Sequence, residues 1–471
     1  MTWELVAGVE THIELSTKSK IFCQCTTEFG GEPNTHCCPV CIGLPGTLPK
    51  LNEKVVEYAI KAGLATNCKI NNFSKMDRKN YVYPDLPKAY QISQYDKPLC
   101  ENGFITLSSG KNINIERIHI EEDAGKLIHG SKDTYIDYNR GGIPLIEVVS
   151  APSIRSIEEA VEYIEKLRLI IKYIGVSDVK MQEGSLRCDV NISVRKKGEK
   201  QFGTRVEIKN MNSLSFIAKA MEYEFQRQID ILECGKEVEQ ETRRYNSGLN
   251  ITESMRGKEQ ADDYRYFREP DLVNIFVLDA EIKKYINELP ELPQEKHTRF
   301  INVYNLPEDD AWLLIKYKKI AEYYEKSIKN TKNKRLAANY ILGPIFRRLT
   351  TEQEREECSI PIPPEFLNEL ILMVEEKKIN SNIARNALEQ MLDAGKSVTE
   401  FISQKDMEGI EEVKLKQICE KAVTANEKAV TQYLSGKEKA LAAVIGNVMK
   451  ETKGKADAVL VTKIVKELIR Q

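Results

Sequence analysis

The sequence predicts an α+β protein, with a large domain of mixed or antiparallel sheet followed by all-α domains. Residues 1–290 contain short segments in which apolar and polar residues alternate, separated by Gly, Pro and Asn. This pattern is typical of strands joined by turns. Prolines at positions 290 and 293 interrupt it, and beyond them Gly and Pro become sparse. Apolar residues in that second half recur at helical spacing, which predicts helices.

The clearest elements of the first domain are one strand and two helices. Apolar and polar residues alternate from Trp3 to Leu15, interrupted only by Val6, as expected for a strand with one buried face. One helix is expected between Ser156, an N-cap with Glu159 in capping-box position, and the stop signal Gly175. A second helix is expected over residues 213–233.

Breaks in composition divide the chain into three predicted domains. These cover residues 1–290, 291–400 and 401–471, with a second Pro-rich break at residues 360–364. Residues 413–471 contain twelve Lys and Arg against six Asp and Glu, an excess of six positive charges. The excess fits either the solvated surface of a helical module or a tail that contacts RNA.

The overall composition excludes several classes of protein. Of the 471 residues, 41% are hydrophobic and 30% are charged, which permits a normal core and argues against disorder. The net charge of −2 is unlike that of a dedicated nucleic-acid binder, so any RNA contact must use local patches. No signal peptide or membrane span is visible. The chain has 11 cysteines, an odd number that cannot all pair in disulfides. We therefore expect reduced thiols and a cytoplasmic location.

Five of the cysteines fall between positions 23 and 41 and predict a metal site. Two tight pairs lie 12 residues apart, and they consist of Cys23, Cys25, Cys38 and Cys41. Two thiolate pairs on turns can surround zinc as a tetrahedron, which leaves no position for water and makes the site structural. His36 and Cys37 are possible substitute ligands. The competing interpretation is a set of reduced cysteines without metal.

Three separate segments carry acids or histidines that would face one side of a sheet. Glu10 and His12 are two residues apart on the first strand, roughly 7 Å along it. Glu121 alternates with apolar neighbours in a second segment, and Glu147 interrupts a wholly apolar third one. A buried carboxylate needs a cation, so we expect these four side chains to share one divalent ion, with magnesium favoured by the oxygen ligands. The alternative is a buried glutamate that pairs with Arg140 or caps backbone N–H groups, with His12 hydrogen-bonded in the core.

A predicted hairpin presents a second polar face. Residues 186–194 alternate strictly, with Arg187, Asp189 and Asn191 on the polar side, and Lys209 lies on the polar side of the following strand. Such a face can hold phosphates or an acyl group, or it can be an ordinary solvated surface. The sequence contains no phosphate-binding P-loop and no Rossmann glycine pattern. It also lacks a nucleophile motif for glutamine hydrolysis.

Long motifs in order along the chain carry a resemblance to a known family. They are VETHIEL at 9–15, GLPGTLP at 43–49, DRKNYVYPD at 77–85, KAYQISQ at 88–94, HIEEDAGK at 119–126, PLIEV at 144–148 and EGSLRCD at 183–189. With the cysteine cluster and Asn139-Arg140, they resemble the B subunits of aspartyl/glutamyl-tRNA(Asn/Gln) amidotransferases, the GatB/GatE family. The resemblance extends over essentially the whole chain.

The resemblance implies a cradle-like catalytic domain, then a helical domain and a small tail similar to the YqeY protein. It implies the partners GatA, a glutaminase, and GatC, together with mischarged tRNA(Gln) or tRNA(Asn). The cysteine pairs match the family's zinc ligands, with Cys37 an addition to the usual pattern. Lys79 and Glu122 match positions along the family's ammonia path, and the family's magnesium ligands match Glu10, His12, Glu121 and Glu147, the last also expected to be catalytic.

The function that follows is ATP-dependent transamidation of Glu-tRNA(Gln) or Asp-tRNA(Asn). The side-chain carboxylate would be phosphorylated by ATP with magnesium and then amidated with ammonia delivered from GatA. Lys79 and Glu122 are candidates for proton handling, and Arg187, Asp189, Asn191 and Lys209 are candidates for nucleotide or acyl contacts. One rival is a non-catalytic zinc-bearing module that only binds tRNA; another is an ATP-grasp-like ligase that uses ammonia directly.

Overall fold

The computed structural model describes residues 3–257, 261–402, 412–452, 456 and 458–470. It divides into two compact units, Met1–Pro293 and Gln294–Gln471. The first unit contains a large mixed sheet and the second is helical in its described part, which confirms the predicted fold class. The finer division into three domains, with boundaries at residues 290 and 400, stays a prediction.

A nine-stranded sheet forms the centre of the first unit. All neighbouring strands are antiparallel except β12 and β13, which are parallel. In spatial order the strands are β14 (Ile251–Gly257), β13 (Glu241–Asn246), β12 (Val206–Lys209), β11 (Leu186–Lys196), β1 (Trp3–Glu14), β10 (Pro144–Ser150), β7 (Asn112–Glu122), β6 (Cys100–Thr106) and β2 (Lys69–Ile70).

Strand β1 lies at the middle of this sheet and has one apolar and one polar face, as its sequence predicts. Val9 and Ile13 are fully buried and belong to the hydrophobic core. The intervening Glu10 and His12 are only partly buried, because successive side chains of a strand point to opposite faces. The strand therefore supplies core residues on one side and functional groups on the other.

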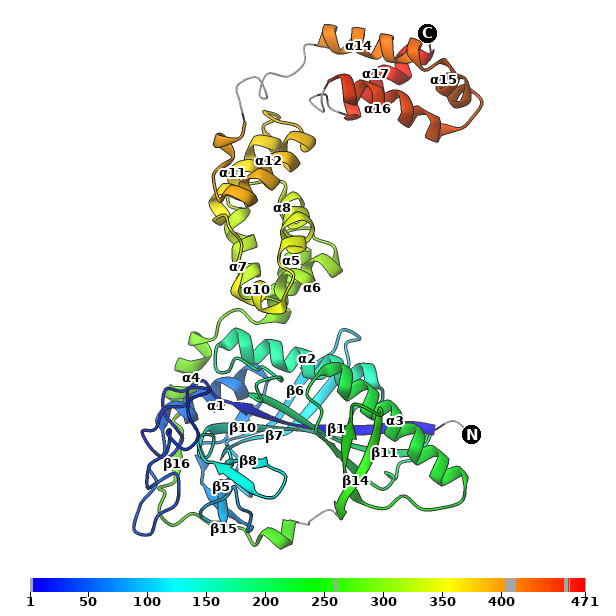
Figure 1. The fold of residues 1–471 in the computed structure, drawn as a ribbon. Coiled ribbons are helices and arrows are strands. Elements are labelled where there is room, and N and C mark those ends of the chain that lie inside the picture. Colours follow the sequence, from blue (N-terminus) through cyan, green and yellow to red (C-terminus); the bar gives the residue numbers. More distant parts are fainter. Residues whose placement is uncertain (1–2, 258–260, 403–411, 453–455, 457, 471) are drawn as a thin grey trace. The chain divides into compact units, whose positions relative to one another are not determined.

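Helices cover the apolar face of the sheet (Figure 1). They are α1 (Glu53–Ala65), α2 (Ile157–Ile174) and α3 (Leu214–Glu233), with α4 (Asp279–Glu288) beside α1. Ser156 caps α2 by accepting from the Glu159 N–H, and Gly175 ends it with a φ of 72°. The Glu159 carboxylate accepts from the N–H of Arg155. In a capping box it would accept from the N–H of the N-cap residue, Ser156, so this second hydrogen bond is shifted by one residue.

Smaller sheets lie on the opposite side of the large sheet from α2 (Figure 1). The three-stranded one is built of β15 (Phe267–Arg268), β4 (Asp77–Asn80) and β5 (Tyr90–Ser93), and β5 contacts β7. Two ribbons complete the set: β16 (Ile275–Phe276) with β3 (Phe73–Ser74), and β8 (Lys126–His129) with β9 (Thr134–Asp137). Of these, the three-stranded sheet contributes Lys79 and Ser93 to a polar cavity that His12 and Glu147 of the large sheet also line.

The second unit contains two hydrophobic clusters, one of residues 300–402 and one of residues 415–465. Its main helices are α5 (Pro293–Asn302), α6 (Glu308–Ile315), α7 (Lys318–Ser327), α8 (Lys334–Tyr340), α9 (Phe346–Arg348), α10 (Glu352–Glu357), α11 (Pro364–Glu375), α12 (Ser381–Ala394), α14 (Glu412–Ala425), α15 (Glu427–Leu434), α16 (Leu441–Glu451) and α17 (Ala458–Arg470). Within the described parts of both units, no helix combines the length and apolar character that crossing a bilayer requires.

Candidate functional site

Three adjacent strands bring a histidine and two glutamates together on the polar face of the sheet. His12 on β1 is the register partner of Glu147 on β10, and Glu147 is in turn the partner of His119 on β7. Glu121 follows two residues after His119 and therefore points the same way. The first of these segments is more than 100 residues away from the other two in the sequence, and the three meet because their strands are neighbours.

The side chains of this cluster are in close contact. The His12 Nε2 atom lies 3.5 Å from Glu121 Oε1 and 3.4 Å from Glu147 Oε2. His119 Nε2 lies 3.3 Å from the same Glu147 oxygen. Glu121 is 3% exposed and Glu147 is 8% exposed, which means that both carboxylates are desolvated and need cationic partners.

Electrostatic coupling within the cluster shifts the pKa values of its members. Burial by itself would lower the pKa of His12, but the hydrogen bond and charge of Glu147 outweigh it and raise the pKa to about 9. Burial would raise the pKa of Glu147, yet His119 and His12 hold it well below its usual range. The cluster therefore favours ionised carboxylates, which is the state that binds a cation.

The geometry of the cluster fits a divalent cation. His12, Glu121 and Glu147 each offer a donor atom, and these atoms lie within 4.8 Å of one another. Two buried polar atoms nearby, His119 Nδ1 and Arg187 Nε, have no hydrogen-bond partner in the described part of the chain, as expected where a ligand or water completes the site. The two carboxylates suit magnesium or manganese, whereas the imidazole favours manganese or a softer ion.

Glu10 lies in the same cavity but outside that set of mutually close donor atoms. Its Oε1 atom accepts a 2.7 Å hydrogen bond from Asn191 on β11, and it lines the cavity together with His12 and Glu147. Its role as a ligand stays a prediction. His119 was not among the predicted site residues. It lies two residues before Glu121 on the same strand face, and this spacing is the signal that could have identified it.

The cluster opens onto two polar cavities, of about 540 and 440 Å³, that share His12, Lys79 and Lys209. The predicted ligand-contacting residues line or border them, but most are paired. Arg187 Nη2 donates to Asp123 at 2.6 Å, and Lys209 Nζ donates to Asp189 at 2.5 Å. Arg140, the alternative partner predicted for Glu147, instead pairs with Asp123, with an Nε–Oδ2 distance of 3.4 Å.

The two residues predicted to handle protons occupy different surroundings. Lys79 lies over the Tyr264 ring, with its Nζ atom 4.7 Å from the ring centroid, and lines both polar cavities. Glu122 is 4% exposed, accepts from Lys88 Nζ at 2.7 Å, and lines a separate cavity of about 220 Å³ beside the cysteines. Glu122 is thus paired with Lys88, a residue that the sequence did not single out.

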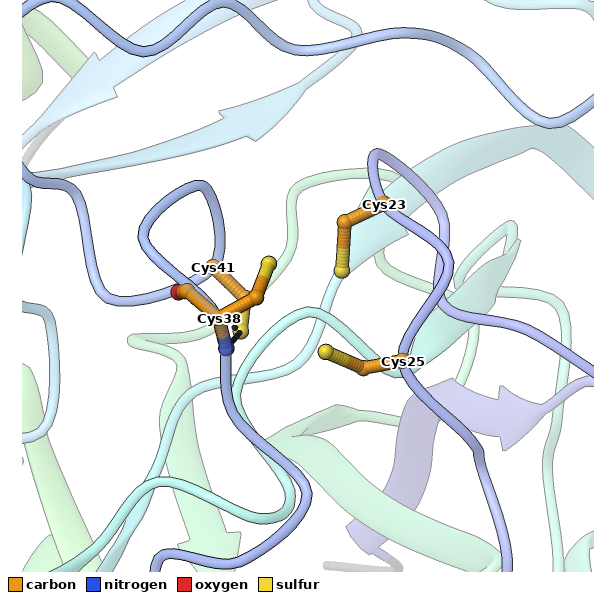
Figure 2. A group of neighbouring side chains, drawn as sticks. All are labelled: Cys23, Cys25, Cys38 and Cys41. Atoms are coloured by element: carbon orange, nitrogen blue, oxygen red, sulfur yellow. Dashed lines mark hydrogen bonds between the residues drawn. The ribbon is translucent and has the colours of Figure 1, made fainter.

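The four predicted zinc cysteines converge (Figure 2). Their sulfur atoms lie within 4.8 Å of one another, and a tetrahedral zinc with 2.3 Å bonds to sulfur needs separations of about 3.8 Å. Hydrogen bonds from Cys23 and from the Cys38 N–H lower the pKa of Cys41 to about 4, and Lys20 adds to this effect. Lys20 is fully buried, with its Nζ atom 3.9 Å from the Cys41 sulfur. The hydrogen bond between Cys23 and Cys41 also raises the pKa of Cys23 above its usual range, and burial raises that of Cys25. Zinc would therefore have to displace protons from these thiols when it binds.

Cys37 lies next to this group and is not one of its four members. Its sulfur interacts with the Asn139 Oδ1 atom at 3.8 Å, while Cys38 supplies the sulfur that faces Cys41. The same Asn139 oxygen accepts from the His36 N–H at 2.8 Å. Of the two adjacent thiols, the geometry therefore favours Cys38 as the ligand.

Two family models match the chain: one described as GatB/GatE catalytic domain over residues 5–283, and one described as GatB domain over residues 322–469. Among curated relatives, the B subunit of the aspartyl/glutamyl-tRNA(Asn/Gln) amidotransferase of Thermoanaerobacter pseudethanolicus is 52% identical over 472 residues, with 99% of each chain covered. Proteins of the same name from Caldicellulosiruptor saccharolyticus and Clostridium novyi are 52% and 49% identical. Both cover 99% of this chain, and the matches span 99% and 100% of their own lengths.

Proposed function

Because the chain belongs to the GatB/GatE family, we propose that it amidates a glutamate or aspartate side chain while that amino acid is still esterified to its tRNA. It acts as one subunit of a glutamine-dependent amidotransferase, whose products are Gln-tRNA(Gln) and Asn-tRNA(Asn) for translation. The observation that carries the proposal is the contact of His12, Glu121 and Glu147 at the floor of two polar cavities.

The reaction needs activation because a carboxylate has no good leaving group. In the proposed sequence, a side-chain carboxylate oxygen attacks the γ-phosphorus of ATP, the bond from that phosphorus to the β-phosphate oxygen breaks, and ADP leaves. Ammonia then attacks the acyl carbon, inorganic phosphate leaves, and one proton is lost to give the amide. Phosphoryl transfer of this kind depends on positioning and on neutralising charge.

The chain's own residues would hold the cation and orient the reactants. His12, Glu121 and Glu147 would bind magnesium, with Glu10 joining them from β1. When bound, magnesium neutralises phosphate charge and aligns the reacting groups. Arg187, Asp189 and Lys209 line the second polar cavity, and Asn191 lines an adjoining cavity that shares Glu10 with the first. They would contact the nucleotide or acyl group, where the cations must exchange their present acidic partners for phosphate oxygens.

Ammonia would come from a separate glutaminase, GatA, with GatC as the third member of the complex. Only neutral ammonia can attack the acyl carbon, so groups along its route must accept a proton from ammonium. Lys79 at the polar cavities and Glu122 beside Lys88 are our candidates. Their separate surroundings suggest successive positions on one route, with Glu122 nearer the cysteine loop.

Zinc and the C-terminal region would have supporting roles. The four cysteines would bind a structural zinc that fixes the loops beside the Glu122 cavity. The basic helices of residues 413–471 would contact the tRNA backbone.

A zinc-bearing module that only binds tRNA is not favoured. Binding of tRNA alone does not require two desolvated carboxylates that face two histidines. Burying such charges costs desolvation free energy, and a catalytic cation site accounts for that cost. The relatives, too, are named as parts of an amidotransferase.

The deciding experiment is transamidation by the chain assembled with its glutaminase and small subunits. Glu-tRNA(Gln) and Asp-tRNA(Asn) are supplied separately, with ATP and either glutamine or ammonium as the nitrogen source. We expect amidated product with at least one tRNA, and with both nitrogen sources. Intact tRNA binding without ATP consumption or product would contradict the proposal and favour the binding module.

A further inference from the structure

A stacked pair of tyrosines lies at the cavity that contains the carboxylate cluster. The rings of Tyr95 and Tyr266 have centroids 4.3 Å apart and an interplanar angle of 7°. Both line the 540 Å³ cavity that His12 and Glu147 also line. Tyr95 is 50% exposed, so the pair keeps accessible aromatic surface instead of being sealed in the core.

The two rings are held in place by a common strand, β4. Asp77 is 1% exposed, and its Oδ2 atom accepts from the Tyr95 N–H at 3.0 Å. On the other side, Asn80 Nδ2 donates to the carbonyl oxygens of Tyr264 and Arg265, at 3.3 and 2.8 Å. Strand β4 therefore holds both the backbone of Tyr95, through Asp77, and the turn before Tyr266, through Asn80.

The backbone of this turn is strained. Arg265 has a φ of 45°, a left-handed conformation that costs a non-Gly residue about 1 kcal/mol or more. It separates Tyr264 from Tyr266 and leaves their rings 6.0 Å apart in an edge-to-face arrangement. Strain of this kind persists where the surroundings enforce it, and it is concentrated at ligand-binding sites.

Cations of the same cavity complement the aromatic surface. Lys79, Arg117 and Arg205 line it together with the tyrosines, and Lys79 lies over the Tyr264 ring. Stacked aromatic rings beside Lys and Arg are the combination that binds nucleotides, because every base has a π face and every phosphate is an anion.

We propose that Tyr95 and Tyr266 form a stacking platform for an adenine base. The proposal rests on the proposed function, which supplies two reactants that carry adenine: ATP, and the 3′-terminal adenosine to which the amino acid is esterified. An adenine stacked on the exposed face of Tyr95 would direct the rest of its molecule toward the cluster of His12, Glu121 and Glu147. That part is the γ-phosphate in ATP and the esterified amino acid in the tRNA.

The test uses the complex assembled with its partner subunits, in which Tyr95 or Tyr266 is changed to Ala or to Phe. Equilibrium binding is measured for a non-hydrolysable ATP analogue, for deacylated tRNA, and for the same tRNA lacking its 3′-terminal adenosine. Because stacking on an aromatic side chain is lost in the Ala variants, we expect about tenfold or more weakening for one ligand. The Phe variants keep a ring and should stay within about twofold of wild type.

The pattern of losses identifies the source of the base. Weaker binding of the ATP analogue alone assigns the platform to the nucleotide. Weaker binding of intact but not of truncated tRNA assigns it to the terminal adenosine. Unchanged affinity for all three ligands in both Ala variants overturns the proposal, as does an equal loss in the Phe variants, since a ring would then not be what matters.

Two features keep the result decisive. Tyr95 is half exposed, so Tyr95→Ala should keep the wild-type melting temperature and can decide the matter alone if Tyr266→Ala is unstable. The binding measurements need no turnover. A wild-type complex that binds its ligands but never transfers phosphate would therefore refute the proposed function and leave the platform to be judged by affinity.

Discussion

His12 and Glu147 are register partners on β1 and β10, and their side chains meet with 3.4 Å between Nε2 and Oε2. The same Glu147 oxygen lies 3.3 Å from His119 on the next strand. One buried carboxylate is thus held between two imidazoles from its neighbouring strands. In a protein without metal this arrangement binds protons, and with metal the ion takes their place.

His12 should make the stability of the metal-free protein depend on pH. Its pKa is about 9 in the metal-free fold and close to 6.5 in an unfolded chain. Protonated His12 therefore stabilises the fold fully below pH 6.5, and this contribution is lost as the pH rises through 9. We expect the melting temperature in a chelator to fall more steeply between these values for wild type than for His12→Gln. Identical slopes would contradict the assignment.

Magnesium binding should depend on pH in the opposite direction to the stability of the metal-free protein. The imidazole must lose its proton to bind a metal, so the affinity for magnesium should rise with pH across the same interval. Calorimetric titration with magnesium alone at pH 6.5 and pH 8.5 measures the effect. A pH-independent affinity would exclude His12 as a ligand.

Adjacent cysteines provide a matched pair for the zinc site. Cys38→Ser removes one of four converging sulfurs, whereas Cys37→Ser changes a thiol that faces Asn139. We expect one zinc per chain in wild type and in the Cys37 variant, and loss of zinc with a lower melting temperature in the Cys38 variant. Metal analysis after dialysis against a chelator decides between them. Zinc lost from the Cys37 variant alone would reverse the ligand assignment.

The Lys88–Glu122 ion pair should matter for stability. The two side chains are 13% and 5% exposed, so Lys88→Met leaves a buried carboxylate without its cation. Removing one partner of a buried pair costs roughly 3–5 kcal/mol, and Glu122→Gln in the same chain should recover part of that loss. Denaturant unfolding of the single and double variants gives the coupling energy.

A surface pair supplies the control for this measurement. Lys54 and Glu57 lie 2.8 Å apart on α1, with Lys54 48% exposed, and exposed pairs contribute under about 1 kcal/mol. Lys54→Met should therefore have a small effect. An equally small effect of Lys88→Met would contradict a stabilising role for the Lys88–Glu122 pair.

The C-terminal region should make tRNA binding dependent on salt. A chain that ends before Val413 loses an excess of six positive charges but keeps every buried residue of the cluster formed by residues 300–402. We expect weaker tRNA binding and a shallower slope of log affinity against log salt. The comparison is a salt titration of both chains in complex with the partner subunits. Equal slopes would remove this region from tRNA recognition.

Local sequence pattern predicted the elements that position the site. Alternation interrupted only at Val6 placed Glu10 and His12 on the polar face of β1, and a lone acid in an apolar segment marked Glu147 as buried. Ser156 and Gly175 marked the ends of α2. Each of these signals lies within one element, where the spacing of side chains determines direction.

Contacts between distant segments were not predictable in this way. The pairing of Glu122 with Lys88 depends on how β5 and its preceding loop pack against β7. The position of His119 beside Glu147 depends on the β7–β10 register. Glu10 bonds Asn191 because β11 is its neighbour. Such relationships are fixed by tertiary packing, which a single sequence does not display.

Phosphoryl transfer from labelled γ-ATP to mischarged tRNA, compared between wild-type and Glu147→Gln complexes, tests the central claim most directly. The amide keeps the size of the side chain but removes the charge on which the cation site depends. We expect phosphoryl transfer by the Glu147→Gln complex to fall by roughly 100-fold or more, while its tRNA binding stays as in wild type. The control variant Glu237→Gln, at an exposed position, should transfer phosphate at the wild-type rate. Undiminished transfer by the Glu147→Gln complex, or a parallel loss of tRNA binding, would contradict a catalytic cation site at this cluster.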